Sequence, residues 1–146
     1  MTEITSDKLI VGPWVAAAVN ADFSPYAAEA IGLRRNGKLV AGVIYENWNG
    51  ASLQVHVAVQ GVMTPKYLAA IYHYPFVHVG AKKLIAGIGE GNKESIRFVS
   101  KMGFRLEGRI PDAHPDGALL LYTMSREQCR YLGERYEQRI VASRRA

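Results

Sequence analysis

NKESIRFVSKMGFRLEGR, residues 92–109, carries the clearest structural signals in this chain. Asn92 is a typical helix N-cap, and Gly103 is the residue type that most often follows the end of a helix. Between them, apolar side chains recur at the spacing of one helix face, at Ile96, Val99 and Met102. We therefore predict a helix over residues 93–102, followed by a strand over residues 104–110.

Upstream of this segment, the hydrophobic pattern changes to short apolar runs typical of strands. Asn36-Gly37 separates two such runs, at residues 31–35 and 38–45. The dipeptide Asn-Gly is the strongest short signal for a β-hairpin. A second turn at residues 47–50 leads into a third run at residues 51–59. The sequence thus predicts three antiparallel strands in a meander.

Helices are predicted on either side of the meander. Residues 9–20 have the pattern of a short helix that is interrupted at Gly12-Pro13, because proline removes a helix hydrogen bond. Thr64-Pro65 has the pattern of an N-cap followed by proline at the first helical position. The helix that starts there is expected to end near Pro75 or a little beyond.

The remaining elements complete a mixed sheet. We predict strands over residues 83–88 and 118–124, a turn over residues 112–117, and a C-terminal helix that begins near Arg126. The order of elements is typical of an α/β domain, more strictly α+β, with one mixed sheet. The chain shows no internal repeat and no linker, so residues 1–146 are expected to form a single domain.

Composition and cysteine usage define a broad class. Hydrophobic residues make up 49% and charged residues 21%, as in ordinary globular proteins, and no apolar stretch is long enough to cross a bilayer. The first ten residues lack the basic segment of a secretory signal, and Cys129 is the single cysteine, so we expect a reducing, cytoplasmic setting. The histidines are scattered without metal-ligand spacing, and no metal is predicted.

The net charge of +5 is concentrated near the C-terminus. Residues 126–146 hold six arginines against three glutamates. Such an excess can attract nucleic acid, but here it lacks the interleaved aromatic residues of a nucleic-acid groove. A solvated amphipathic helix is the favoured interpretation, and nucleic acid is not the expected partner.

The order of elements and the segment 92–109 together resemble the GNAT acyltransferase superfamily. The family's motif B reads N-x-x-S/A, then seven residues, then G-F-x-x-E-G. The matching positions here are Asn92, Ser95, Gly103, Phe104, Glu107 and Gly108. The resemblance extends over about residues 31–132. It is nearest to the branch that acetylates protein N-termini and to related small proteins from bacteriophage genomes.

This resemblance implies a GNAT-like acyl-CoA N-acyltransferase fold. Its central, mostly antiparallel sheet is flanked by helices and contains one parallel pair of strands that splay apart, here expected at residues 53–59 and 84–88. Acetyl-CoA or another acyl-CoA would bind between them as the co-substrate, and backbone groups freed by the splay would pair with the pantetheine amides. By resemblance, the residues that contact CoA in this part of the site are Val57, Ala58, Val59, Asn92 and Ser95.

The loop expected to hold the pyrophosphate departs from the family pattern. The usual pattern is Q/R-x-x-G-x-G/A, whose glycines let the backbone approach closely, whereas residues 60–65 read Gln-Gly-Val-Met-Thr-Pro. A helix N-terminus still follows, and its free N–H groups favour an anion. We expect CoA binding to be retained through Val62, Met63, Thr64 and Lys66. The alternative is a site that has decayed.

Acyl transfer to an amine needs a base for the amine and a proton for the departing thiolate. The family's usual proton donor is a tyrosine five residues before the Phe of Gly-Phe, and that position is Val99 here. Ser95, directly or through water, and Tyr122, if it faces the cleft, are the candidate replacements. His56 is the candidate base because an imidazole can accept a proton near neutral pH. The alternative for His56 is a half-buried histidine bonded to a neighbour, and Glu46 is a weaker candidate at the acceptor pocket.

The favoured function is transfer of an acetyl or acyl group from acetyl-CoA to an amine of a protein, peptide or small molecule. A catalytically silent GNAT-like binding or regulatory protein is the alternative, because the loop and Val99 depart from the family. A nucleic-acid-directed modifier is a third, less favoured hypothesis. Four aromatic residues suggest either an acceptor cleft or the surface of a homodimer, namely Trp14, Phe23, Tyr26 and Trp48.

Overall fold

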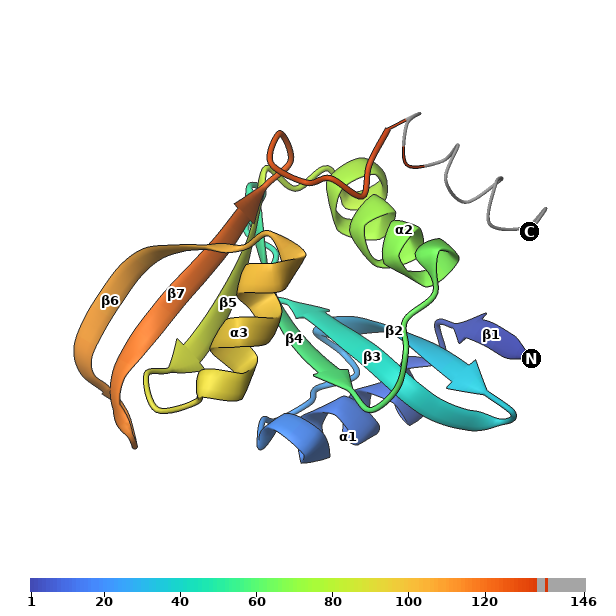
Figure 1. Ribbon diagram of the computed structural model, residues 1–146, viewed down its shortest axis with the longest axis horizontal. Coiled ribbons are helices and arrows are strands. Elements are labelled where there is room, and N and C mark those ends of the chain that lie inside the picture. The colour runs from blue at the N-terminus through green and yellow to red at the C-terminus, as the bar shows by residue number, and fades with distance from the viewer. Residues whose placement is uncertain (134–135, 137–146) are drawn as a thin grey trace.

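The computed structural model describes residues 1–133 and residue 136. They form a seven-stranded sheet in the order β1-β2-β3-β4-β5-β7-β6 with helices on both faces (Figure 1). The elements are β1 (Thr2–Thr5), α1 (Lys8–Val19), β2 (Ala28–Arg35), β3 (Lys38–Glu46), β4 (Ser52–Val59), α2 (Pro65–His73), η1 (Tyr74–Val79), β5 (Lys83–Gly89), α3 (Lys93–Met102), β6 (Arg105–His114) and β7 (Gly117–Ser125).

The meander of β2, β3 and β4 is confirmed. Asn36 and Gly37 form the two-residue turn of the first hairpin, with φ of 52° and 82°. Both values are positive, which is the conformation that Asn-Gly adopts most readily in a hairpin turn. The short strand β1 was not predicted; it pairs with β2 at the edge of the sheet. Its four residues carry too little alternation to stand out locally.

The predicted interruption of the first helix is wrong. α1 runs unbroken from Lys8 to Val19 with Pro13 inside it, and the Asp7 carboxylate caps its first turn. Pro13 lies on the exposed side of the helix, where water can satisfy the carbonyl that loses its partner. Val11 and Val15, both fully buried, anchor the opposite side against the sheet. Tertiary packing therefore outweighs the unfavourable helix propensity of proline.

The helices divide the molecule into two hydrophobic cores. α2, η1 and α3 pack on one face of the sheet and enclose the larger core (Figure 1). α1 packs on the other face, over β2, β3 and β4, and closes the smaller core. As predicted, α2 begins after Thr64, whose hydroxyl accepts a hydrogen bond from the Tyr67 amide, and α3 begins after Asn92 and ends at Gly103.

The parallel pair of strands, β4 and β5, is paired over only three residues of each. Ser52, Leu53 and Gln54 of β4 face residues 83–85 of β5, and no pairing follows. β5 then pairs along its whole length with β7, while β4 stays paired with β3. The two strands thus separate beyond Gln54, as the expected splay requires. All the other strand pairs are antiparallel.

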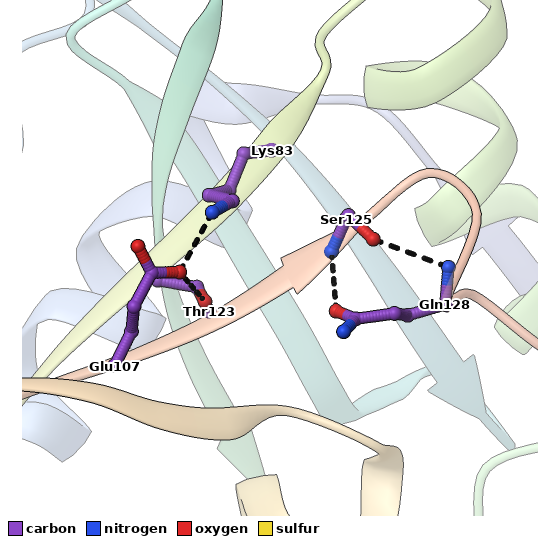
Figure 2. Close-up of polar contacts among 5 residues, drawn as sticks. All are labelled: Lys83, Glu107, Thr123, Ser125 and Gln128. Atoms are coloured by element: carbon purple, nitrogen blue, oxygen red, sulfur yellow. Dashed lines mark hydrogen bonds and ion pairs between the residues drawn. The ribbon is translucent and has the colours of Figure 1, made fainter.

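The last hairpin is longer than predicted. β6 continues to His114 through a bulge at Asp112, whose φ is 59°, so the turn is confined to Pro115 and Asp116. Figure 2 shows Glu107 of β6 bonded to the Lys83 amine at 2.6 Å and to the Thr123 hydroxyl at 2.7 Å. This carboxylate ties together the three strands on the far side of the splay.

The predicted start of the C-terminal helix near Arg126 is wrong, although Tyr136, within the predicted helix, is helical. Residues 126–133 form turns. Ser125 and Gln128 exchange two hydrogen bonds that close the first of these turns, as Figure 2 shows. Most of the arginine-rich stretch lies outside the described residues. Within the part of the chain that is described, no helix is long and apolar enough to cross a membrane.

Candidate functional site

A cavity of about 130 Å³ opens where β4 and β5 separate. Its walls come from both strands and from α3, together with Val19 at the end of α1 and His114 at the end of β6. His56 and Gly87 lie on the α1 side of the sheet, whereas Val55 and Ala86 point into the α3 core. The cavity therefore passes through the sheet, joining one face to the other.

A larger hollow of about 350 Å³ continues from this cavity along β4. It lies between the unpaired half of β4, the first turns of α3 and the end of α1. The five residues predicted to contact the pantetheine arm all line it, namely Val57, Ala58, Val59, Asn92 and Ser95. This half of β4 has no strand partner on its β5 side, so its backbone can pair with a ligand.

Asn92 and Ser95 sit where the two hollows meet, because both residues line each of them. The Asn92 side-chain oxygen accepts a hydrogen bond from the Ser95 amide at 3.2 Å, which is the N-cap of α3. The capping role is thus confirmed. It fixes Asn92 and Ser95 at the rim of the hollow, so capping and contact with a ligand are compatible.

His56 is bonded to a carboxylate. Its Nε2 lies 2.7 Å from Oε1 of Glu46, and the two side chains are 27% and 22% exposed. Glu46 pairs with Gln54 across β3 and β4, two residues along from the pair Ile44–His56, so both side chains lie on the α1 face. Because an ionised carboxylate only accepts hydrogen bonds, a neutral His56 carries its proton on Nε2 and its lone pair on Nδ1. The alternative of a half-buried histidine bonded to a neighbour is thus confirmed, and the same bond leaves Nδ1 with the lone pair that a base would use.

The two other candidate proton donors differ in position. Ser95 lines both hollows, and Val99 lines the cavity at the position where the family has its tyrosine. Tyr122 pairs with Ala86 on the α3 side of the sheet, is only 8% exposed and lines neither hollow. Of the two hydroxyls predicted from the sequence, only that of Ser95 reaches the cavity.

The loop after β4 reaches the larger hollow only with its first residue, Gln60. Val62, Met63, Thr64 and Lys66 line neither hollow. The Thr64 hydroxyl caps α2, and the Val62 carbonyl accepts a hydrogen bond from the Arg35 guanidinium at 3.0 Å. Sequence reasoning missed Arg35. Arg35 of β2 thus brings one cation to the loop, and Lys66 adds a second in the first turn of α2, whose N-terminus favours an anion.

His114 was also missed by sequence reasoning. It lies at the end of β6, far along the chain from the predicted site, and it reaches the cavity beside Gly89. Only the pairing of β6, β7 and β5 brings it there. A histidine next to a Pro-Asp turn has no sequence signal that could have identified this position.

Other predicted candidates contribute little to the cavity. None of the four aromatic residues suggested for the acceptor cleft lines either hollow: Trp14, Phe23, Tyr26 and Trp48. Cys129 is buried, and burial raises the pKa of its thiol to about 11, which disfavours the reactive thiolate. Among residues 1–133 and 136, no three metal-binding side chains come together.

No protein-family model and no curated protein sequence matches this chain. Solved structures do. A mutant form of the spermidine/spermine N-acetyltransferase SpeG from Vibrio cholerae aligns with a TM-score of 0.69 at 10% identity, covering 95% of this chain and 99% of that one. A GNAT family acetyltransferase from Elizabethkingia anophelis with acetyl-CoA bound aligns with a TM-score of 0.64 at 16% identity, covering 85% of this chain and 97% of that one. The chain therefore has the fold of the GNAT acetyltransferases.

Proposed function

We propose that this protein transfers an acetyl group, or another acyl group, from acyl-CoA to an amine. One observation carries the proposal. A hollow follows the unpaired half of β4 and opens into a cavity through the sheet, at which the imidazole of His56 stands. A structural neighbour with acetyl-CoA bound and others named as N-acetyltransferases support the same reaction class.

The donor would lie along β4. Its pantetheine amides would pair with the backbone of Val57, Ala58 and Val59, which have no strand partner on the β5 side, while Asn92 and Ser95 contact the arm from α3. The pyrophosphate would meet the N-terminus of α2 with help from Lys66. Without the family's glycines, the loop backbone cannot approach the pyrophosphate as closely. The positive charges of Lys66 and of the helix N-terminus would offset part of that loss.

The acceptor would approach from the α1 face, where His56 and Glu46 lie. An amine is mostly protonated near neutral pH and must lose a proton before it can attack. Nδ1 of His56 would take that proton. The amine nitrogen would then bond to the thioester carbon, the carbon–sulfur bond would break, and CoA would leave as a thiolate that needs a proton.

Three narrower parts of this proposal rest on the sequence. They are membership of the bacteriophage-type branch, a cytoplasmic location for a protein with one buried cysteine, and self-association as a homodimer. Spermidine, named for a structural neighbour, is one member of the amine panel to be tested.

A catalytically silent binding protein is the competing function, because Val99 leaves α3 without the family's proton donor. Calorimetric titration with acetyl-CoA and with CoA, followed by thiol release in the presence of peptide N-termini, lysine, spermidine and small primary amines, separates the two. We expect micromolar binding and amine-dependent thiol release. Binding without turnover of any amine would favour the silent protein. No binding of acetyl-CoA or CoA would overturn the assignment of the hollow along β4 as the acyl-CoA site.

A matched pair of variants shows whether binding occurs in the hollow. Ser95→Phe should fill it and abolish binding of CoA. Ser100→Phe makes the same change on the exposed side of α3, away from both hollows, and should leave binding intact.

A further inference from the structure

The proposed function gives the cavity a base, His56, but α3 offers the cavity only the Ser95 hydroxyl as a proton donor. Val99 occupies the wall where a hydroxyl would serve, and Ser95 offers an alcohol, which is a much weaker acid than a thiol. A thiolate leaving group therefore cannot be protonated efficiently by Ser95 alone. A group on the cavity wall with a more acidic proton would speed this step.

His114 is, with His56, one of two imidazoles that line the cavity. It comes from the opposite direction, from the end of β6, and its ring packs against the exit of β5. A Cβ built on Gly89 would lie 2.5 Å from Cε1 of His114, so the glycine is what allows the ring to lie there. The ring is half-buried, with its side chain 33% exposed.

The turn that follows His114 contacts its Nδ1. The Asp116 amide donates a hydrogen bond to Nδ1 at 3.1 Å, so the neutral ring carries its proton on Nε2. A charged ring carries a second proton on Nδ1, and the Asp116 carboxylate, 3.9 Å from Nδ1, lies on that side of the ring. His56 has the same neutral tautomer but is bonded through the other nitrogen, because its Nε2 contacts Glu46, whereas His114 is bonded through Nδ1.

We infer that His114 is the general acid that protonates the departing CoA thiolate, in place of the tyrosine absent at position 99. This inference rests on the proposed function. His56 accepts a proton from the ammonium group, the amine bonds to the carbonyl carbon, and the carbon–sulfur bond breaks. A charged His114 ring gives a proton to the sulfur and becomes neutral, and the second proton lost by the amine goes to solvent or restores the charge of His114. The products are an amide, CoA thiol and one released proton.

Two variants test this role. His114→Gln removes the acid, and Gly89→Ala keeps the imidazole but pushes it off the wall. We expect each to lower kcat with acetyl-CoA roughly 100-fold, the usual worth of acid catalysis, and to leave the Kd for CoA unchanged. His78→Gln, on the exposed π-helical turn away from the cavity, is the control and should retain wild-type kcat.

Changing the leaving group of the acyl donor shows whether His114 acts as an acid or only supports the structure of the site. Phenyl thioacetate releases a thiolate that needs no proton, so with this donor His114→Gln should approach the rate of wild type measured with the same donor. Equal losses with both donors, or an unchanged kcat with acetyl-CoA, would overturn the inference while leaving the transferase intact. An inactive wild-type protein would instead defeat the proposed function, and this inference with it.

Discussion

Oε1 of Glu46 lies 2.7 Å from Nε2 of His56, across the β3–β4 pair and beside the point where β4 leaves β5. The bond holds the imidazole at a fixed orientation and leaves Nδ1 as the nitrogen with a lone pair. Carboxylates play this orienting part for histidine bases on unrelated folds. Accepting the proton, by His56, and orienting the imidazole, by Glu46, are therefore two roles that can be tested separately.

Substituting His56 should abolish most of the turnover. His56→Gln keeps the size and polarity of the side chain but removes the proton acceptor, and we expect kcat to fall by about 100-fold or more. The measurement is steady-state thiol release with a responsive amine, together with the Kd for acetyl-CoA, which should not change. His73→Gln, on the exposed side of α2, should behave as wild type. If His56→Gln loses donor affinity instead of kcat, the residue supports the donor site rather than acting as base.

Glu46 should act through His56. Glu46→Gln can no longer fix which ring nitrogen carries the proton, so we expect a smaller loss of kcat, about 10-fold, with an unchanged Kd for acetyl-CoA. Combining it with His56→Gln should cost little more than His56→Gln alone, because the two side chains work as a unit. Additive losses in the double variant would contradict this and assign Glu46 a separate task.

Lys66 should strengthen the binding of acyl donors that carry phosphates and leave the binding of other donors unchanged. Lys66→Ala removes an exposed cation from the first turn of α2, and a loss of about 0.3–1 kcal/mol corresponds to a Kd for CoA that rises roughly 2- to 5-fold. The effect should shrink at high salt. Acetyl-pantetheine, which has no pyrophosphate, should bind both proteins alike. Lys82→Ala, an exposed lysine before β5, is the control; a loss with acetyl-pantetheine as well would contradict the assignment.

Local signals in the sequence were enough for the elements they specify. The cap at Asn92 and the stop at Gly103 predicted α3 at its observed bounds, and Asn36-Gly37 predicted the first hairpin. Elements that depend on distant partners were missed or misjudged. β1 exists because it pairs with β2, and α1 continues through Pro13 because its buried valines pack on the sheet.

The same distinction between local signals and distant partners applies to the candidate site. The residues along β4 and at the start of α3 were predicted from a resemblance that follows the chain, and the structure places them in one hollow. The bond between Glu46 and His56 depends on strand register, which the sequence does not specify to the residue. His114 could not be predicted, since it meets Gly89 only because β5 pairs with β7 and not with β6, the next strand in the chain.

Acid should weaken the far side of the sheet through Glu107. Hydrogen bonds from Lys83, and then from Thr123, lower the pKa of this carboxyl from its ordinary value. A lowered pKa in the folded state contributes stability above the ordinary value, and that stability is lost as pH falls through the folded pKa. Glu107→Gln should therefore have a lower Tm than wild type at neutral pH, and the difference should shrink in acid. Thermal melts from pH 7 to pH 3 measure this. Glu127→Gln, an exposed carboxylate after β7, is the control, and a difference that stays constant with pH would show that Glu107 acts by packing and not by charge.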